Sequence, residues 1–217
     1  EIMDKQLFDY DDSSVESVLE YSQHLLDKPF LEIINSYKES SYKAYEDFQT
    51  KTISNVSNKE ISMKSKGQYG NYIEKYFYGY QPNSDSEPDF EKIGVELKVT
   101  PFKVNKNGSI SAKERLVLTI LNYMEENLED FYATHLWEKC SKILLLFYNG
   151  LIPNQTLADY IIEKVFMYEW FEEDMEVILE DYKRITQKIK DGRAHELSES
   201  DGNYLSTCTK GAGGGKD

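Results

Sequence analysis

Two carboxylates and a lysine lie close together in the sequence, at a spacing that suits hydrolysis of a phosphodiester bond. Asp89 is followed by Glu96, Leu97 and Lys98. Such hydrolysis needs a hard cation that neutralises charge on the phosphate and lowers the pKa of the attacking water. Mg²⁺ binds oxygen ligands and keeps several of its waters. The residues therefore predict a magnesium site made by Asp89, Glu96 and the backbone carbonyl of Leu97.

A β-strand over residues 94–101 is expected to position these groups. Its apolar residues alternate with Glu96 and Lys98, so the two charged side chains share one face. From that face Lys98 can reach the water or the scissile phosphate. A Glu-x-Lys triplet alone is weak evidence, because roughly one arises by chance in a chain of ordinary charged composition. The competing interpretation is a surface strand with a Glu/Lys pair.

Helices are expected on both sides of this strand. In the first segment, 1–62, Asp12-Ser13-Ser14 offers a helix N-cap before apolar residues at helical spacing, and a second helical run follows Pro29. A later helix carries Glu74, a further acid for the rim of the site, and is ended by Gly79. Residues 172–190 have acids in the first turn and bases in the last, which favours a helix.

Three further apolar runs are expected to extend the sheet. Two of them are nearly continuous, as in central strands that are covered on both faces. The runs are 115–121, 142–148 and 160–168. Helices followed by mixed strands and helices predict an α/β (α+β) fold with a mixed central sheet flanked by helices.

The composition limits the kinds of protein that fit. The 217 residues suffice for one domain or two small lobes, and they contain no apolar run long enough to span a membrane. The start of the sequence lacks the pattern of a secretory signal, so a cytoplasmic protein is expected. Cys140 and Cys208 do not have the spacing of a zinc site or of a disulfide framework.

The net charge of −14 weighs against a nucleic acid as partner, because phosphate binding normally leaves a basic footprint. Binding depends, however, on where the basic residues lie and not only on their sum. Each basic cluster is by itself more often a solvated face than a binding site. The clusters lie within 103–115, 139–142 and 183–193, with Lys210 near the end.

A dense set of motifs resembles the MutH family and the related Sau-type restriction endonucleases that act at GATC. The resemblance covers most of the chain after the first 60 residues. Its motifs are Lys66-Gly67-Gln68-Tyr69-Gly70, Glu74, Pro88-Asp89-Phe90, the run from Gly94 to Pro101, residues 113–118, 139–147 and 174–192, and His195-Glu196-Leu197-Ser198 with Thr207-Cys208-Thr209-Lys210.

The resemblance implies a restriction-endonuclease-like fold in which two lobes form a DNA cleft. An N-terminal helical segment, 1–62, would precede a catalytic core, 63–217, that ends in a DNA-recognition loop. The implied activity is Mg²⁺-dependent cleavage of double-stranded DNA at GATC, leaving 5′-phosphate ends. The implied protein is a monomer in isolation that can pair on DNA.

The resemblance also assigns roles by position. Catalytic roles fall on Glu74, Asp89, Glu96, Lys98 and Lys139, with Asp89, Glu96 and Leu97 as metal ligands. DNA contacts fall on Lys66, Thr207, Cys208, Thr209 and Lys210. MutH-type proteins carry Arg-Pro-Lys where this chain has Cys-Thr-Lys, a form that the Sau-type enzymes share. The base-reading arginine is absent here, so this departure bears on GATC specificity and leaves catalysis untouched.

Three functions remain open from the sequence. A type II restriction endonuclease that cuts both strands is favoured by the Cys-Thr-Lys triplet. A MutH-like mismatch-repair nickase differs from it in partner and in strand choice. A non-catalytic DNA-binding regulatory module would not need the intact set of Asp89, Glu96 and Lys98.

Overall fold

The computed structural model describes residues 10–30, 32–33, 68–80, 87–151 and 159–208. The chain divides into two compact units. Unit 1 holds the chain up to Val117 and residues 143–168, and unit 2 holds residues 118–142 and the chain from Glu169 onward. The two lobes with a DNA cleft that the resemblance implies, and the domain bounds 1–62 and 63–217, stay predictions.

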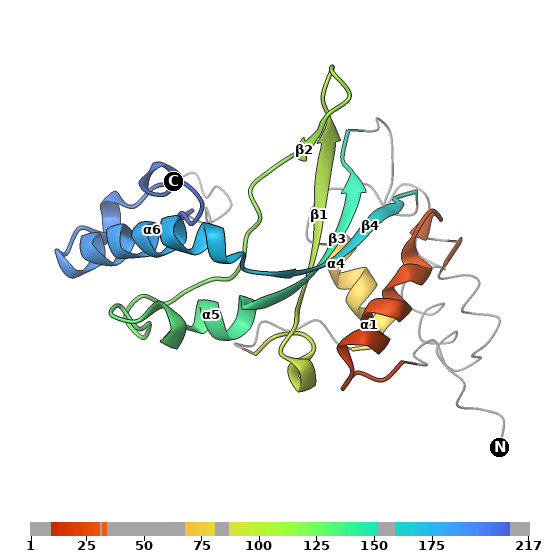
Figure 1. Cartoon of the computed structure of the whole chain (residues 1–217), viewed down its shortest axis with the longest axis horizontal. Helices are drawn as coiled ribbons and strands as arrows, with labels where there is room; N and C mark the ends of the chain where they lie inside the picture. Colours follow the sequence, from red (N-terminus) through yellow and green to blue (C-terminus); the bar gives the residue numbers. More distant parts are fainter. Residues whose placement is uncertain (1–9, 31, 34–67, 81–86, 152–158, 209–217) are drawn as a thin grey trace, which may run out of the picture. The chain divides into compact units, whose positions relative to one another are not determined.

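A four-stranded sheet forms the centre of unit 1, in the order β2-β1-β3-β4 (Figure 1). β1 pairs antiparallel with β2 and parallel with β3, so the sheet is mixed, as predicted. The chain passes between the units at the first residue of β3 and the last residue of β4. The strands are β1 (Glu96–Val104), β2 (Ile110–Ala112), β3 (Lys142–Asn149) and β4 (Ile162–Glu169).

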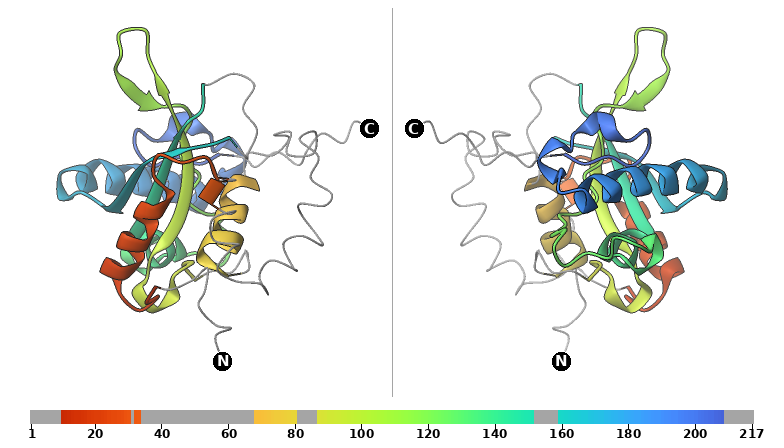
Figure 2. Two further views of the ribbon diagram at one scale, coloured as in Figure 1. Left: turned by 90° about the vertical axis from the view of Figure 1, so that its right-hand side faces the viewer. Right: turned by 90° about the vertical axis from the view of Figure 1, so that its left-hand side faces the viewer.

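Two helices pack on one side of this sheet (Figure 2). They are α1 (Val15–Ser22) and α4 (Gln68–Ile73), and α4 continues into a π-helical turn, Glu74–Tyr78. Alternate residues of β1 and β3 point to the helices, as the period of two along a strand requires. The core therefore joins buried side chains from both helices and both strands: Val18, Leu25, Ile73, Phe77, Leu97, Leu144 and Leu146.

The opposite face of the sheet carries the charged residues of β1. The parallel register sets Glu96 beside Ile143 and Lys98 beside Leu145. Neighbouring residues in register point to the same side of a sheet. The charged pair therefore lies on the face turned away from α1 and α4.

The ends of the unit 1 helices follow local rules. Ser14 caps α1, and its side chain accepts a hydrogen bond from the N–H of Ser17. Gly79 ends the π-helical turn with a φ of 85°, a conformation that glycine adopts without strain. Both helix ends confirm the prediction from sequence.

The helical run expected after Pro29 lies mostly outside the described residues. Shorter 3-10 turns cover Gln23–Leu25 and Glu91–Ile93.

The strand predicted over residues 115–121 is wrong. These residues form no regular element, and the side chains of Val117 and Ile120 are 57% and 69% exposed. β2, which the sequence did not predict, pairs with β1 only at Phe102–Val104. Residues 114–116 line a pocket over Leu145 and Phe147. The run then passes from unit 1 into unit 2 between Val117 and Leu118, so its apolar composition is not enough to make it a strand of the sheet.

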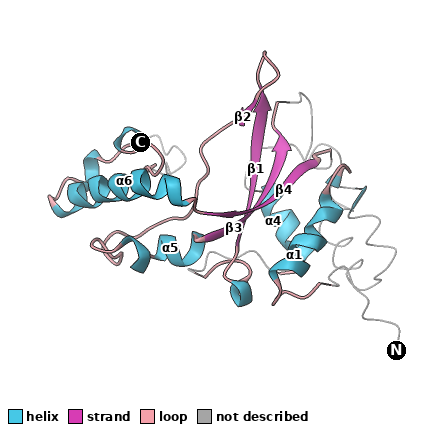
Figure 3. Cartoon of the chain, viewed as in Figure 1, coloured by secondary structure: helices cyan, strands magenta, loops and turns pink. Residues whose placement is uncertain are grey.

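Unit 2 consists mainly of helices and loops (Figure 3), and it contains a cluster of aromatic rings. The helices are α5 (His135–Cys140) and α6 (Glu172–Lys190), the latter with the predicted bounds. Phe131 contacts the rings of Trp137, Trp170 and Tyr182 at centroid distances of 5.3–5.6 Å. Shorter 3-10 turns cover Phe131–Ala133, Ala194–Glu196 and Glu199–Asp201.

The architecture is that of an α+β protein and is consistent with the restriction-endonuclease-like fold. β3 and β4 confirm the predicted runs 142–148 and 160–168, and β1 extends the predicted run to Val104. Within the ranges that the structure describes, no helix is long and apolar enough to cross a membrane.

Candidate active site

Asp89 is held against the start of β1 by a short closed loop. The chain turns through Glu91–Ile93 and through Gly94, which has a φ of 63°. Phe90 and Val95 then pair by two backbone hydrogen bonds, of 2.9 and 3.3 Å. The loop therefore brings Asp89, seven residues before Glu96, beside the first residues of the strand.

Two hydrogen bonds fix the Asp89 carboxylate and its neighbour. The N–H of Leu97 donates to Oδ2 of Asp89 at 2.9 Å, and the N–H of Asp89 donates to Oε2 of Glu96 at 3.3 Å. The other carboxylate oxygen of Asp89, Oδ1, accepts no hydrogen bond from the described residues. The two acids that the sequence singled out are therefore neighbours in the fold, joined through the backbone.

Lys98 lies beside Glu96, as the strand alternation predicted. Its Nζ donates to Oε1 of Glu96 at 2.6 Å. The Glu96 side chain is only 4% exposed and the Lys98 side chain 21% exposed. A carboxylate so far removed from water needs a cationic partner, because an unpaired buried charge is costly. The pair leaves Lys98 at the rim, where its ammonium reaches solvent.

Glu74 lies in the π-helical turn beside β1. A side chain on Gly70 would place its Cβ 3.9 Å from Oε1 of Glu74 and 3.9 Å from the Val99 side chain. Glu74 and Asp89 both act on Tyr80: burial raises the pKa of the Tyr80 hydroxyl well above its ordinary value, and these two carboxylates raise it further. The two acids therefore lie close to the same phenol.

The donor set fits a hard cation that keeps part of its water shell. In the described part of the chain, no group of three or more His, Cys, Asp and Glu side chains could hold a metal ion. Two carboxylates, Asp89 and Glu96, are available, and Leu97 can add only its backbone carbonyl, because a leucine side chain has no atom that binds a cation. Mg²⁺ is commonly bound through one or two carboxylates, and it completes its octahedron with water and substrate phosphate.

Two further lysines carry roles that the resemblance predicts. Lys139 lies in α5, in unit 2, and is half-buried. Lys66 lies outside the described residues. The roles that the resemblance gives to both lysines stay predictions.

A second polar site, in unit 2, holds the segment that leads into the predicted recognition loop. Asp181 of α6 is fully buried. Its Oδ2 accepts hydrogen bonds from the backbone N–H groups of Asn203, Tyr204 and Leu205 at 2.8–3.0 Å. One carboxylate oxygen therefore fixes three successive residues of the chain, directly before Thr207.

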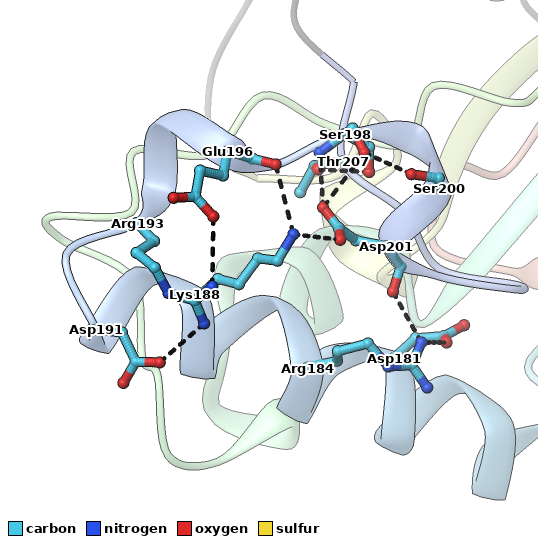
Figure 4. A network of polar contacts seen from close by, with 10 residues as sticks. All are labelled: Asp181, Arg184, Lys188, Asp191, Arg193, Glu196, Ser198, Ser200, Asp201 and Thr207. Carbon is cyan, nitrogen blue, oxygen red and sulfur yellow. Dashed lines mark hydrogen bonds and ion pairs between the residues drawn. The ribbon is translucent and has the colours of Figure 1, made fainter.

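Basic residues of α6 complete this network (Figure 4). Arg184 donates to Oδ1 of Asp181 at 3.0 Å and to the carbonyl of Asp201 at 2.8 Å. Lys188 forms an ion pair with the Asp201 carboxylate, which also accepts from the N–H of Ser198 at 2.7 Å. The Thr207 hydroxyl donates to the Ser198 carbonyl at 3.3 Å. These contacts tie residues 198–207 to one helix.

The network also accounts for much of the third basic cluster. Arg184 and Lys188 pair with Asp181 and Asp201, Lys190 pairs with Glu129, and Arg193 pairs with Asp191 and Glu196. The solvated or structural interpretation of this cluster is therefore favoured over a phosphate-binding one. Of the predicted loop residues, Thr207 is half-buried and Cys208 is an exposed free thiol, whereas Thr209 and Lys210 lie outside the described residues.

Sequence reasoning missed Asp181 and Tyr80. Asp181 has a signal in the sequence, because it lies on the apolar stripe of α6, three residues after Ile178 and four before Ile185, both buried. An acid at such a position predicts a buried carboxylate with local partners. Tyr80 has no comparable signal, since it follows the helix end at Gly79 and lies among several other tyrosines.

The sheet with paired acids at the start of β1 defines the chain as a protein of the restriction-endonuclease-like class. The family described as "DNA mismatch repair enzyme MutH" matches residues 78–181. The "Type II restriction enzyme Sau3AI" of Staphylococcus aureus is 42% identical over 164 residues, which are 75% of this chain and 33% of that protein. Both matches support a family of the MutH and Sau3AI type for this chain, which spans about a third of the length of that relative.

Proposed function

We propose that this chain is the catalytic part of a magnesium-dependent type II restriction endonuclease. In this proposal it hydrolyses both strands of double-stranded DNA at GATC and leaves 5′-phosphate ends. The observation that carries the proposal is the linkage of Asp89, Glu96 and Lys98 at the start of β1 through contacts of 2.6–3.3 Å. A restriction endonuclease acts on DNA inside the cell, so the proposed location is the cytoplasm.

The acids and the lysine have separate tasks in the proposed reaction. Asp89 and Glu96, with the carbonyl of Leu97, would hold Mg²⁺, which supplies charge neutralisation at the phosphate and a more acidic water when bound. Lys98, at the rim, would stabilise the negative charge that develops on the phosphate in the transition state. Its contact with Glu96 fixes the ammonium where that charge develops.

Glu74 and Lys139 are proposed as auxiliary groups. Glu74, which lies near Tyr80 together with Asp89, would orient water on the acidic side of the site. Lys139 would add a second cation near the phosphate. Lys66 would contact the DNA backbone, because an ammonium group is well suited to a single phosphate oxygen.

The test of catalysis compares two DNA duplexes that differ in a single GATC, each incubated with the protein and Mg²⁺. We expect breaks only in the duplex that contains GATC, and EDTA should stop them. Asp89→Asn should abolish cleavage, whereas Glu91→Gln, the loss of an exposed acid two residues away, should not. Cleavage by Asp89→Asn at the rate of the unaltered protein would contradict the assignment of the acids.

The same assay separates the proposal from its main alternative. A MutH-like nickase, which the family match at residues 78–181 favours, would leave one strand intact. Breaks in both strands support the restriction role. Binding to GATC without any break, in Mg²⁺ or Mn²⁺, would instead support the regulatory module and exclude both nucleases.

GATC recognition is proposed for residues 207–210, which follow the segment held by Asp181. We favour a phosphate contact for Lys210, since lysine is a point charge and the bidentate reading of guanine suits arginine better. Lys210→Ala should then weaken binding to GATC and scrambled duplexes alike and lower the salt slope by about one unit. Loss of a base contact would instead cost ~1–3 kcal/mol at one position of the site.

The control is Lys28→Ala, because Lys28 is exposed and lies outside the resemblance. Unchanged affinity and salt slope for Lys210→Ala would refute the assignment of the recognition loop.

A further inference from the structure

Tyr80 has a buried hydroxyl group without a partner. Its hydroxyl oxygen is one of two buried side-chain polar atoms that lack a hydrogen bond within the described ranges. A buried donor left unpaired costs folding free energy, so native proteins rarely keep one without a use. The position of this hydroxyl therefore calls for an acceptor.

The neighbouring tyrosines show that the packing could satisfy such a group. The hydroxyl of Tyr10 donates to the carbonyl of Tyr78 at 2.9 Å, and that of Tyr21 donates to the carbonyl of Phe77 at 2.8 Å. The Tyr78 hydroxyl lies 2.6 Å from the hydroxyl of Ser22. Tyr80 belongs to the same aromatic cluster, but its buried hydroxyl has no such partner.

The Tyr80 ring is fixed next to the candidate metal ligands. It stacks on Tyr78 at a centroid distance of 6.2 Å and meets Phe90 edge-on at 5.5 Å. Phe90 directly follows Asp89 and is itself pinned to Val95 at the start of β1. The ring therefore packs against the same short loop that carries Asp89.

Asp89 and Glu74 are the charged groups that act on the Tyr80 hydroxyl. A tyrosine keeps its proton at neutral pH, because the ordinary pKa of a phenol is about 10. Oδ1 of Asp89 accepts no hydrogen bond from the described residues, whereas Oδ2 is fixed by Leu97. A phenol that remains protonated is a donor, and Oδ1 is a fitting acceptor.

We propose that Tyr80 is a positioning residue for the cation site, whose hydroxyl donates to the Asp89 carboxylate when a divalent cation binds. Hydrogen bonds from surrounding groups orient carboxylates that bind metals, and their loss weakens metal affinity. The proposal rests on the proposed function, because it takes Asp89 as a ligand. Without the cation the Tyr80 hydroxyl stays unpaired. When the cation is bound, the hydroxyl donates to the Asp89 carboxylate.

The experiment compares Tyr80→Phe with the unaltered protein in the absence of DNA. Affinity for Mn²⁺ is measured by electron paramagnetic resonance, and thermal unfolding is followed with and without Mn²⁺. Tyr80→Phe should raise the melting temperature of the metal-free protein, because an unpaired buried hydroxyl is removed. It should also weaken Mn²⁺ binding about tenfold and reduce the gain in melting temperature on adding Mn²⁺.

Two further variants make the outcome unambiguous. Tyr78→Phe removes a paired hydroxyl from the same cluster, so it should lower the melting temperature and leave Mn²⁺ affinity unchanged. Glu96→Gln should abolish Mn²⁺ binding. If Glu96→Gln loses Mn²⁺ while Tyr80→Phe binds it as tightly as the unaltered protein, the role of Tyr80 is refuted and the metal site stands. If Glu96→Gln still binds Mn²⁺ normally, both the metal site and the role of Tyr80 are refuted.

Discussion

The carboxylate of Asp89 accepts a hydrogen bond from the backbone N–H of Leu97 at 2.9 Å. A single side chain thereby serves two purposes, since Oδ2 anchors the loop to β1 and Oδ1 remains available for a cation. The two purposes can be separated by substitution, because one depends on an oxygen acceptor and the other on negative charge.

Asp89→Asn should fold like the unaltered protein but should not cleave DNA. Asparagine retains an oxygen for the N–H of Leu97 but has no charge for a cation. Asp89→Ala removes the acceptor as well and should lower the free energy of unfolding by about 1–3 kcal/mol, the cost of an unpaired buried donor. Urea unfolding and cleavage assays on both variants check this. Equal stability of the two variants would contradict the anchoring role.

Lys98→Met should reduce cleavage by about 10²-fold or more, because a donor aimed at developing charge is lost. The variant should not lose Mn²⁺ affinity, because Lys98 is not a ligand and the Glu96 carboxylate is no longer paired with an ammonium group. The metal-free protein should be less stable, because Glu96 stays buried without its partner. Single-turnover cleavage and Mn²⁺ titration measure the two effects.

Lys92→Met is the matched control for Lys98→Met. Lys92 forms an ion pair with Asp12 at 2.7 Å, but both side chains are more than half exposed. Exposed pairs contribute little to stability. A loss of Mn²⁺ affinity in Lys98→Met as large as that in Glu96→Gln would refute the division of roles.

The Asp181 network should make unit 2 sensitive to acid. Burial by itself raises the pKa of Asp181, but the backbone N–H groups of Asn203, Tyr204 and Leu205 and the guanidinium of Arg184 outweigh it and hold the pKa below 3.8. The folded state thus binds its proton less readily than the unfolded state. The stabilisation is complete above about pH 4 and is lost as the pH falls through the lowered pKa.

Tryptophan fluorescence reports this transition, because both tryptophans, Trp137 and Trp170, belong to unit 2. Asp181→Asn should lower the stability of unit 2 at pH 7 and flatten its dependence on pH below 4. Asp174→Asn, at the start of α6, removes a half-buried acid of the same helix and should leave that dependence in place. An unchanged acid transition in Asp181→Asn would contradict the assignment.

Gly202→Ala should displace the segment before the recognition loop. A Cβ at this position would clash with the carbonyl oxygen of Leu205 and lie 3.2 Å from Cγ of Asp181, so the backbone must move. Overpacking of this kind costs about 1–3 kcal/mol. We expect lower stability of unit 2 and a smaller ratio of GATC to non-GATC binding.

Gly108→Ala provides the comparison for Gly202→Ala. Gly108 lies in the turn between β1 and β2, where an added Cβ meets nothing within 4 Å. The substitution lowers stability only through the strain of a side chain at a φ of 81°. It should leave tryptophan fluorescence and the binding ratio unchanged. An unaltered ratio in Gly202→Ala would show that the segment does not set the geometry of the loop.

Several features of the fold arise only from contacts between distant parts of the chain. Residues 115–121 have the composition of a buried strand, yet they cross from unit 1 into unit 2 and form no regular element. The closeness of Asp181 to Asn203 and the place of Tyr80 beside Asp89 also depend on packing. Patterns among neighbouring residues do not show where the chain crosses between units or which loop returns to a helix.

The sequence alone determined the elements with a strong local period. The alternation around Glu96 and Lys98 placed both on one face of β1, and the amphipathic pattern of residues 172–190 gave the bounds of α6, because strand and helix periods are set by neighbouring residues. The resemblance named the same acids. Only the tertiary structure joined Asp89 to Leu97 and left the Tyr80 hydroxyl buried without a partner, since both depend on how a loop closes in three dimensions.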